Sequence, residues 1–158
     1  MRKKVMIGSV AVGGGEKVKI QSMTTCKTSD IEKCAAQTNA LAAAGCEIIR
    51  YAVLDEDDAR AIKTLKTKVF LPIVADIHFS PRLAVLAVEN GADKLRINPG
   101  NIGGEKEIAL VADCVKAHHI PVRVGANTGS IEKQFLARYG KSAQALAESA
   151  LYNAAILE

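Results

Sequence analysis

The residues with the clearest chemistry are three arginines, each placed within a short aliphatic segment: Arg50, Arg96 and Arg123. A guanidinium that is buried without a partner is strongly unfavourable, so an anion should meet each of them. The forked geometry of arginine matches phosphate oxygens. Three positive charges fit a diphosphate or two phosphates better than a single carboxylate. The alternative is a structural network in which Asp76 and nearby acids neutralise the arginines.

Two asparagines, Asn98 and Asn127, follow Arg96 and Arg123 near the ends of the same segments. An asparagine amide both donates and accepts, so these side chains could fix ester oxygens or hydroxyls of a substrate. They could equally cap the loops that follow. The glycine-rich stretch 98–104 adds backbone amides and then a helix start, which suits either a phosphate or a plain turn.

Asp76 and His78 are two residues apart, so in an extended strand they lie on one face. The pair is a candidate for acid and base catalysis or for substrate contact. Two ligands do not make a metal site, and the other histidines, His118 and His119, are expected at the opposite end of the fold. We therefore predict no metal site in this chain.

The four cysteines are Cys26, Cys34, Cys46 and Cys114, and none is spaced as C-x-x-C. That spacing argues against a zinc knuckle or a thioredoxin motif, and reduced thiols are expected. Cys34 and Cys114 lie in apolar helical patterns and are interpreted as structural. Cys26 follows the first aliphatic segment and could be exposed near the site, but a lone cysteine is weak support for a nucleophile.

Aliphatic segments alternate with helical patterns along the chain. Strands are predicted over Lys17–Met23, Glu47–Val53, Leu71–His78, Asp93–Asn98 and Pro121–Asn127. Helices are predicted over Ser29–Ala44, from about Asp55 to Leu65, from Ser80 to Gly91, from Gly104 to His119 and from Ser142 to the C-terminus. For the first helix, Ser29 and Glu32 predict a capping box and Gly45 a left-handed stop.

This alternation predicts an α/β fold with a parallel sheet and right-handed crossovers. Strand starts lie roughly 22–30 residues apart, close to the ~31 residues per unit of a TIM-type barrel. Within the segments, aliphatic residues alternate with the polar ones named above. A doubly wound sheet is apolar on both faces, whereas a barrel covers only its outer face with helices. We therefore expect a partial barrel with about five of the eight βα units.

Two regions are expected: an N-terminal β-hairpin over residues 1–16 and a partial barrel over residues 17–158. The composition is 49% hydrophobic and 24% charged, which is typical of a globular domain and not of a disordered chain. No apolar run reaches the ~20 residues of a membrane span, so no membrane partner is expected. Aromatic residues are only 4% and Trp is absent, which disfavours nucleic acid. The net charge of +4 suits small anions.

Several motifs, in this order, resemble the barrel domain of the 4-hydroxy-3-methylbut-2-enyl diphosphate synthase family. They are Gln-Ser-Met-Thr at 21–24, Ile-Arg-Tyr-Ala-Val at 49–53, Ala-Asp-Ile-His-Phe at 75–79, Arg-Ile-Asn-Pro-Gly-Asn-Ile-Gly at 96–103 and Arg-Val-Gly-Ala-Asn-Thr-Gly-Ser at 123–130. The resemblance runs from about Lys4 to the last residue and places the three arginines on motif positions for the diphosphate, with both asparagines beside them.

The resemblance implies an oxidoreductase of isoprenoid biosynthesis by the methylerythritol phosphate pathway. Such an enzyme reductively opens 2-C-methyl-D-erythritol 2,4-cyclodiphosphate. It uses a 4Fe–4S cluster, with electrons from ferredoxin or flavodoxin, as a homodimer in the bacterial cytoplasm. The family's barrel has eight units and its cluster domain supplies the cysteines, and neither the last units nor that cysteine motif is found here. We therefore expect an N-terminal fragment that is inactive alone. The alternatives are a non-catalytic anion-binding or assembly module and a dihydropteroate synthase-like pterin-binding barrel.

Overall fold

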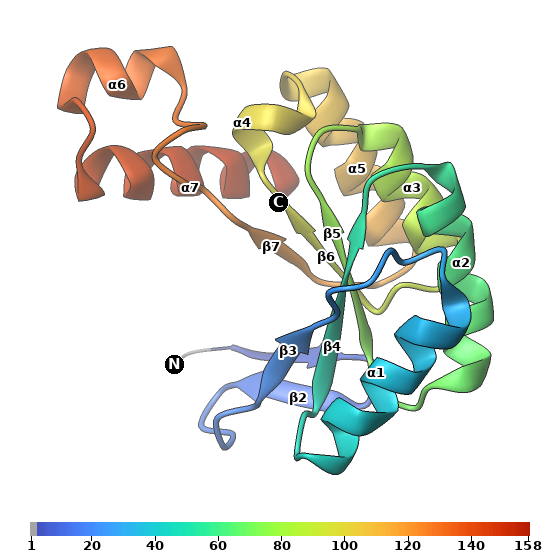
Figure 1. Ribbon diagram of the computed structural model, residues 1–158. Coiled ribbons are helices and arrows are strands. Elements are labelled where there is room, and N and C mark those ends of the chain that lie inside the picture. Colours follow the sequence, from blue (N-terminus) through green and yellow to red (C-terminus); the bar gives the residue numbers. More distant parts are fainter. Residues whose placement is uncertain (1–2) are drawn as a thin grey trace.

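The computed structural model describes residues 3–158, apart from the side chain of Pro99. Five parallel strands form one sheet in chain order, and helices between them cover one of its faces (Figure 1). The strands are β3 (Gln21–Met23), β4 (Ile48–Val53), β5 (Ile73–Ile77), β6 (Lys94–Ile97) and β7 (Val122–Val124). The covering helices are α1 (Ile31–Ala43), α2 (Glu56–Lys68), α3 (Pro81–Glu89) and α5 (Glu105–Ala117). The predicted α/β partial barrel is confirmed.

The helices begin and end at the predicted signals in most cases. Asp55 caps α2, where its carboxylate accepts from the N–H of Asp58 at 2.9 Å, and Ser80 caps α3 directly before a proline. Gly45 and Gly91 follow their helices with φ of 98° and 96°, as a left-handed stop requires.

The predicted capping box at the start of α1 is wrong. The cap is Asp30, whose carboxylate accepts from the N–H of Lys33 at 3.4 Å. The N–H of Ser29 instead donates to the carboxylate of Asp58 at 2.8 Å. A tertiary contact with α2 therefore fixes Ser29 outside the helix, and sequence spacing alone does not reveal that contact.

Alternation along the strands separates two faces. In β4, Ile49, Tyr51 and Val53 are fully buried against the helices in the main core. Leu95 and Ile97 of β6 do the same, and each is 0% exposed. Their neighbours in sequence point to the other side of the sheet, which we call the inward face. The inward face is the side of a barrel on which binding sites are built.

A β-hairpin packs against the inward face at the start of the strands. It consists of β1 (Lys4–Ile7) and β2 (Val10–Gly13), paired antiparallel. Ile7 of this hairpin forms a second small core with Ile48 and Val74. The hairpin lies within the predicted range 1–16, of which residues 1–2 fall outside the described residues. It closes the inward face at the amino ends of the strands and leaves the carboxyl ends open.

Several elements differ from the prediction. The strands are shorter than predicted, most clearly β3. Residues 17–20 are not part of β3, because its one partner strand, β4, begins at Ile48 opposite Gln21. Two helices, α4 (Pro99–Ile102) and α6 (Lys133–Tyr139), were not predicted. The last helix, α7 (Ala143–Leu157), begins after Ser142 as expected. No helix within residues 3–158 is long and apolar enough to cross a membrane.

Candidate functional site

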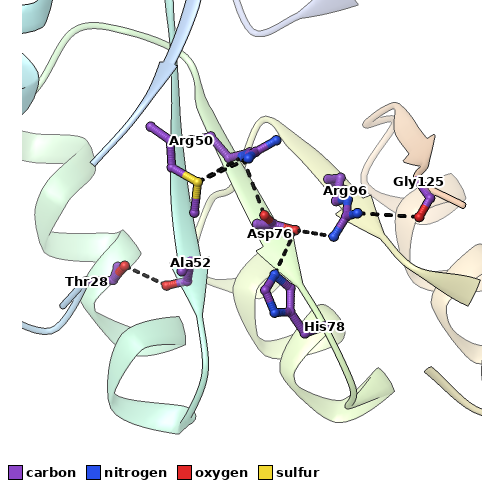
Figure 2. A network of polar contacts seen from close by, with 8 residues as sticks. Thr28, Arg50, Ala52, Asp76, His78, Arg96 and Gly125 are labelled. Atoms are coloured by element: carbon purple, nitrogen blue, oxygen red, sulfur yellow. Dashed lines mark hydrogen bonds and ion pairs between the residues drawn. The ribbon is translucent and has the colours of Figure 1, made fainter. Parts of the chain in front are cut away.

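Asp76 of β5 is the centre of a polar network on the inward face (Figure 2). The side chain is almost completely buried, and the strand register places it beside Arg96 of β6. Its Oδ1 accepts from Nη1 of Arg96 at 3.0 Å, and its Oδ2 lies 3.4 Å from Nε of Arg50. One carboxylate therefore serves two guanidinium groups, as the structural alternative anticipated, and one positive charge stays uncompensated.

Arg50 is only weakly bound by its other neighbour. Its Nε and Nη2 donate to the thioether sulfur of Met23 at 3.2 and 3.1 Å, and a thioether is a poor acceptor. Within residues 3–158, Nη1 of Arg50 and Nε of Arg96 make no hydrogen bond. Both guanidiniums are partly exposed, at 27% and 19% of the side chain. The pair thus presents unused donors to an anion at the carboxyl ends of the strands.

Gly125, which follows β7, sets the position of the Arg96 side chain. Nη2 of Arg96 approaches the carbonyl of Gly125 at 3.4 Å. A Cβ atom at residue 125 would lie 2.5 Å from Nε of Arg96, which is too close for any side chain. A glycine is therefore required there if Arg96 is to keep this orientation.

His78 joins the same network. Its Nε2 lies 3.5 Å from Oδ1 of Asp76, so the predicted pair does lie together. The imidazole is about one-third exposed, at 37% of the side chain, and stands edge-on to the exposed ring of Phe79. A partly exposed imidazole held by a buried carboxylate is suited to giving or taking a proton.

Asn98 and Asn127 are brought together by Ser130, a residue to which the sequence assigned no role. The Ser130 hydroxyl lies 2.8 Å from Oδ1 of Asn98 and 3.2 Å from Oδ1 of Asn127. Gly100 permits this approach, because a Cβ atom there would lie 1.8 Å from the Ser130 carbonyl oxygen. The amide nitrogens of both asparagines make no hydrogen bond within the described part of the chain, so they remain available as donors.

Arg123 is on the inward face but outside the Asp76 network. It pairs in register with Arg96 on the neighbouring strand, yet its side chain is exposed and no carboxylate among the described residues forms an ion pair with it. With Lys94 it lines a hollow of about 330 Å³ between the hairpin and β7. Burial and the charge of Arg123 lower the pKa of Lys94. The convergence of three arginines is therefore partial: two share a carboxylate and the third lies beside them.

The glycine-rich stretch 98–104 does not form an open phosphate cradle at the start of α5. The N–H of Gly104 donates to the carboxylate of Glu107 at 2.9 Å. That amide already has an anionic partner within its own helix. The interpretation of this stretch as a turn is the better one at Gly104.

The cysteines do not fit an iron–sulfur cluster. A four-iron cluster takes four protein ligands, usually cysteine thiolates. Among residues 3–158, no group of three or more His, Cys, Asp or Glu side chains is placed to hold a metal ion. Cys26 and Cys34 lie side by side, whereas Cys46 donates to the carbonyl of Ile48 at 3.1 Å.

Comparison with known proteins identifies the family. The model of the GcpE TIM-barrel domain matches residues 2–158. The chain is 51% identical to the 4-hydroxy-3-methylbut-2-en-1-yl diphosphate synthase (flavodoxin) of Caldicellulosiruptor saccharolyticus, over 100% of this chain and 46% of that protein. The synthase of the same name from Desulfotalea psychrophila is 53% identical, over 99% and 44%. That of Thermotoga petrophila is 51% identical, over 100% and 44%. The chain thus spans a little under half the length of these relatives, and it belongs to the GcpE TIM-barrel domain family.

Proposed function

We propose that this chain is the substrate-binding barrel portion of a 4-hydroxy-3-methylbut-2-enyl diphosphate synthase and that its inward face binds the phosphates of 2-C-methyl-D-erythritol 2,4-cyclodiphosphate. The observation that carries the proposal is the pair Arg50 and Arg96, which share one buried carboxylate and keep unused donors. The names of the relatives support the same reaction. The family match sets aside the pterin-binding alternative.

Each residue has a distinct role in this proposal. Arg50 and Arg96 bind one phosphate from the centre of the sheet, and Arg123 reaches the other from the neighbouring strand. The amides of Asn98 and Asn127 donate to ester or hydroxyl oxygens. Asp76 contacts both arginines and orients their side chains toward the substrate. His78 exchanges a proton with the substrate's leaving oxygen.

The complete reaction needs parts outside these 158 residues. We propose that a 4Fe–4S cluster is held by another portion of the longer protein, because the cysteines described here do not fit it. The relatives' names indicate flavodoxin as the electron donor, and ferredoxin is the alternative that the family resemblance leaves open. We place the enzyme in the bacterial cytoplasm, and we expect the 158-residue chain alone to bind phosphates without turnover.

Calorimetric titration of the cyclodiphosphate into the full-length protein tests the proposal. Loss of the charge-assisted bonds in Arg96→Ala should weaken binding by roughly 10–100-fold. Arg96→Lys should recover only part of the loss, since lysine keeps the charge but not the fork. Arg60→Ala is the matched control, because Arg60 is an exposed α2 residue paired with Glu56. Equal affinities for the Arg96→Ala and Arg60→Ala proteins would remove Arg96 from the binding site.

The β7 edge of the sheet supports a proposal of self-association of the 158-residue chain on its own. β7 has β6 on one side and no strand on the other among the described residues. A hollow of about 540 Å³, lined in part by Val122, Val124 and Leu157, lies beside it. Unpaired edges favour pairing with a second chain. We therefore propose that the 158-residue chain, when isolated, forms a homodimer, and a monomeric mass by light scattering over a wide concentration range would contradict it.

A further inference from the structure

Two cysteines lie in contact at the edge of the site. Cys26 is in the loop that links β3 to α1, and Cys34 is in α1. Their sulfur atoms are 2.7 Å apart, although both are free thiols. A disulfide bond is about 2.05 Å long, so the sulfurs need to approach by only roughly 0.7 Å to form one.

The surroundings of the two thiols tolerate the loss of both S–H groups. Cys34 donates to the carbonyl of Lys27 at 3.2 Å, and Cys26 lies 3.5 Å from Oε1 of Gln37. Each acceptor has a second donor: the N–H of Asp30 reaches the Lys27 carbonyl at 3.0 Å, and the N–H of Thr25 reaches Oε1 of Gln37 at 2.9 Å. Oxidation would therefore leave neither acceptor without a partner.

The two sulfurs differ in access. Cys26 is partly exposed and lines a hollow of about 390 Å³ with Met23 and Thr28. Cys34 is fully buried. This burial, and to a lesser extent the hydrogen bond to Cys26, raises the pKa of the Cys34 thiol to about 12. An oxidant arriving from solvent therefore reaches the Cys26 sulfur first, and the buried Cys34 provides the second sulfur of the disulfide.

We propose that Cys26 and Cys34 form an oxidation site at which a peroxide converts the two thiols into a disulfide. The Cys26 sulfur attacks one peroxide oxygen and breaks the O–O bond, and the leaving hydroxide takes up the thiol's proton, so the products are a sulfenic acid and one water. The Cys34 sulfur then attacks the Cys26 sulfur and breaks its S–O bond, and the leaving hydroxide takes up the Cys34 proton to give the second water. The sum is two thiols and one hydrogen peroxide giving one disulfide and two waters.

The disulfide would fasten the loop between β3 and α1 beside the arginine pair. This loop follows Met23, whose sulfur contacts Arg50, and Thr28 ties it to the end of β4 through a bond of 2.6 Å to the Ala52 carbonyl (Figure 2). A covalent link to α1 would restrict the backbone motion that these contacts still allow in the loop residues between them. We expect slower amide hydrogen exchange over residues 24–30 in the oxidised protein.

Peptide mapping of the full-length protein tests the proposal. The reduced protein is treated with equimolar hydrogen peroxide, alkylated and digested with trypsin, which cleaves after Lys27 and Lys33. Peptides 20–27 and 34–50 should appear cross-linked, about 2 Da lighter than their sum. Because Cys46 shares the second peptide, fragmentation must assign the bond to Cys34.

Matched variants separate this pair from general oxidation. Cys26→Ser should leave Cys34 reduced and alkylated, whereas Cys114→Ser should cross-link like the unchanged protein. Wild-type protein whose Cys26 proceeds to sulfinic acid while Cys34 is alkylated would overturn the proposal, and so would a bond assigned to Cys46. The measured quantity is a covalent link, so its result does not depend on whether the chain binds phosphate.

Discussion

The two faces of strands β4, β5 and β6 have opposite characters although their residues alternate along the same backbone. On the helix side, Ile49, Ile77 and Leu95 are fully buried among other apolar side chains. On the inward side, Arg50 and Arg96 share the carboxylate of Asp76. The first face gains free energy from burial, and the second keeps uncompensated charge available for a ligand. Stability and chemistry are therefore assigned to alternate residues, so substitutions one position apart should have different consequences.

The largest expected effect is on the helix side. Leu95→Ala removes a side chain that is 0% exposed in the main core, which should lower the free energy of unfolding by about 2–5 kcal/mol. The affinity of the folded fraction for the cyclodiphosphate should not change. Denaturant unfolding and calorimetry check both values. If the variant lost affinity at full stability, the division between the two faces would be wrong.

Asp76→Asn is expected to affect both properties. The amide cannot neutralise Arg50 and Arg96, so two partly buried positive charges repel each other. We expect a loss of about 1–3 kcal/mol in the free energy of unfolding. Adding pyrophosphate, which supplies the missing negative charge, should restore more stability to the variant than to the unchanged protein. Equal stabilisation of both proteins in thermal unfolding would argue that the arginine pair does not meet the anion.

Tyr51→Phe probes a polar group on the apolar side. The Tyr51 hydroxyl lies 2.7 Å from that of Thr38, and both residues are fully buried. Removing one partner should cost about 1 kcal/mol. Burial raises the pKa of Tyr51 to about 12, so the folded protein holds a proton that the unfolded chain loses above about pH 10. Stability should therefore fall between pH 10 and 12, and it should fall less steeply in the variant.

The smallest effect on stability is expected at Gly125→Ala. The new methyl group would contact the flexible end of Arg96, which moves aside at a cost of under about 1 kcal/mol. The displaced guanidinium should then bind phosphate about fivefold less tightly, a change of about 1 kcal/mol. Unchanged affinity in calorimetry, with Gly129→Ala as the loop control, would mean that the orientation of Arg96 has no role.

The sequence predicts the two faces well because alternation is a local property. Period-two patterning placed Arg50, Asp76 and Arg96 on one side and Leu95 on the other, as observed. The pairing of Asp76 with both arginines depends on strand order and register. It could be anticipated here because the strands of the sheet follow the order of the chain.

Contacts between distant loops could not be predicted in the same way. Ser130 bridges two asparagines through a close approach to Gly100, and a serine after a glycine otherwise indicates an ordinary turn. Asp30, and not the predicted Ser29, caps α1, because the N–H of Ser29 donates to the carboxylate of Asp58 in α2. Cys26 and Cys34 meet only because the loop after β3 folds back on α1. In each case a tertiary contact decides between local options that the sequence leaves nearly equal.

A crystal structure of the full-length protein with bound cyclodiphosphate tests the central claim most directly. We predict phosphate oxygens within hydrogen-bond distance of Arg50 and Arg96 on the inward face, with Asp76 still contacting both arginines. A ligand bound only in the hollow beside Lys94, or on the helix side of the sheet, would contradict the account.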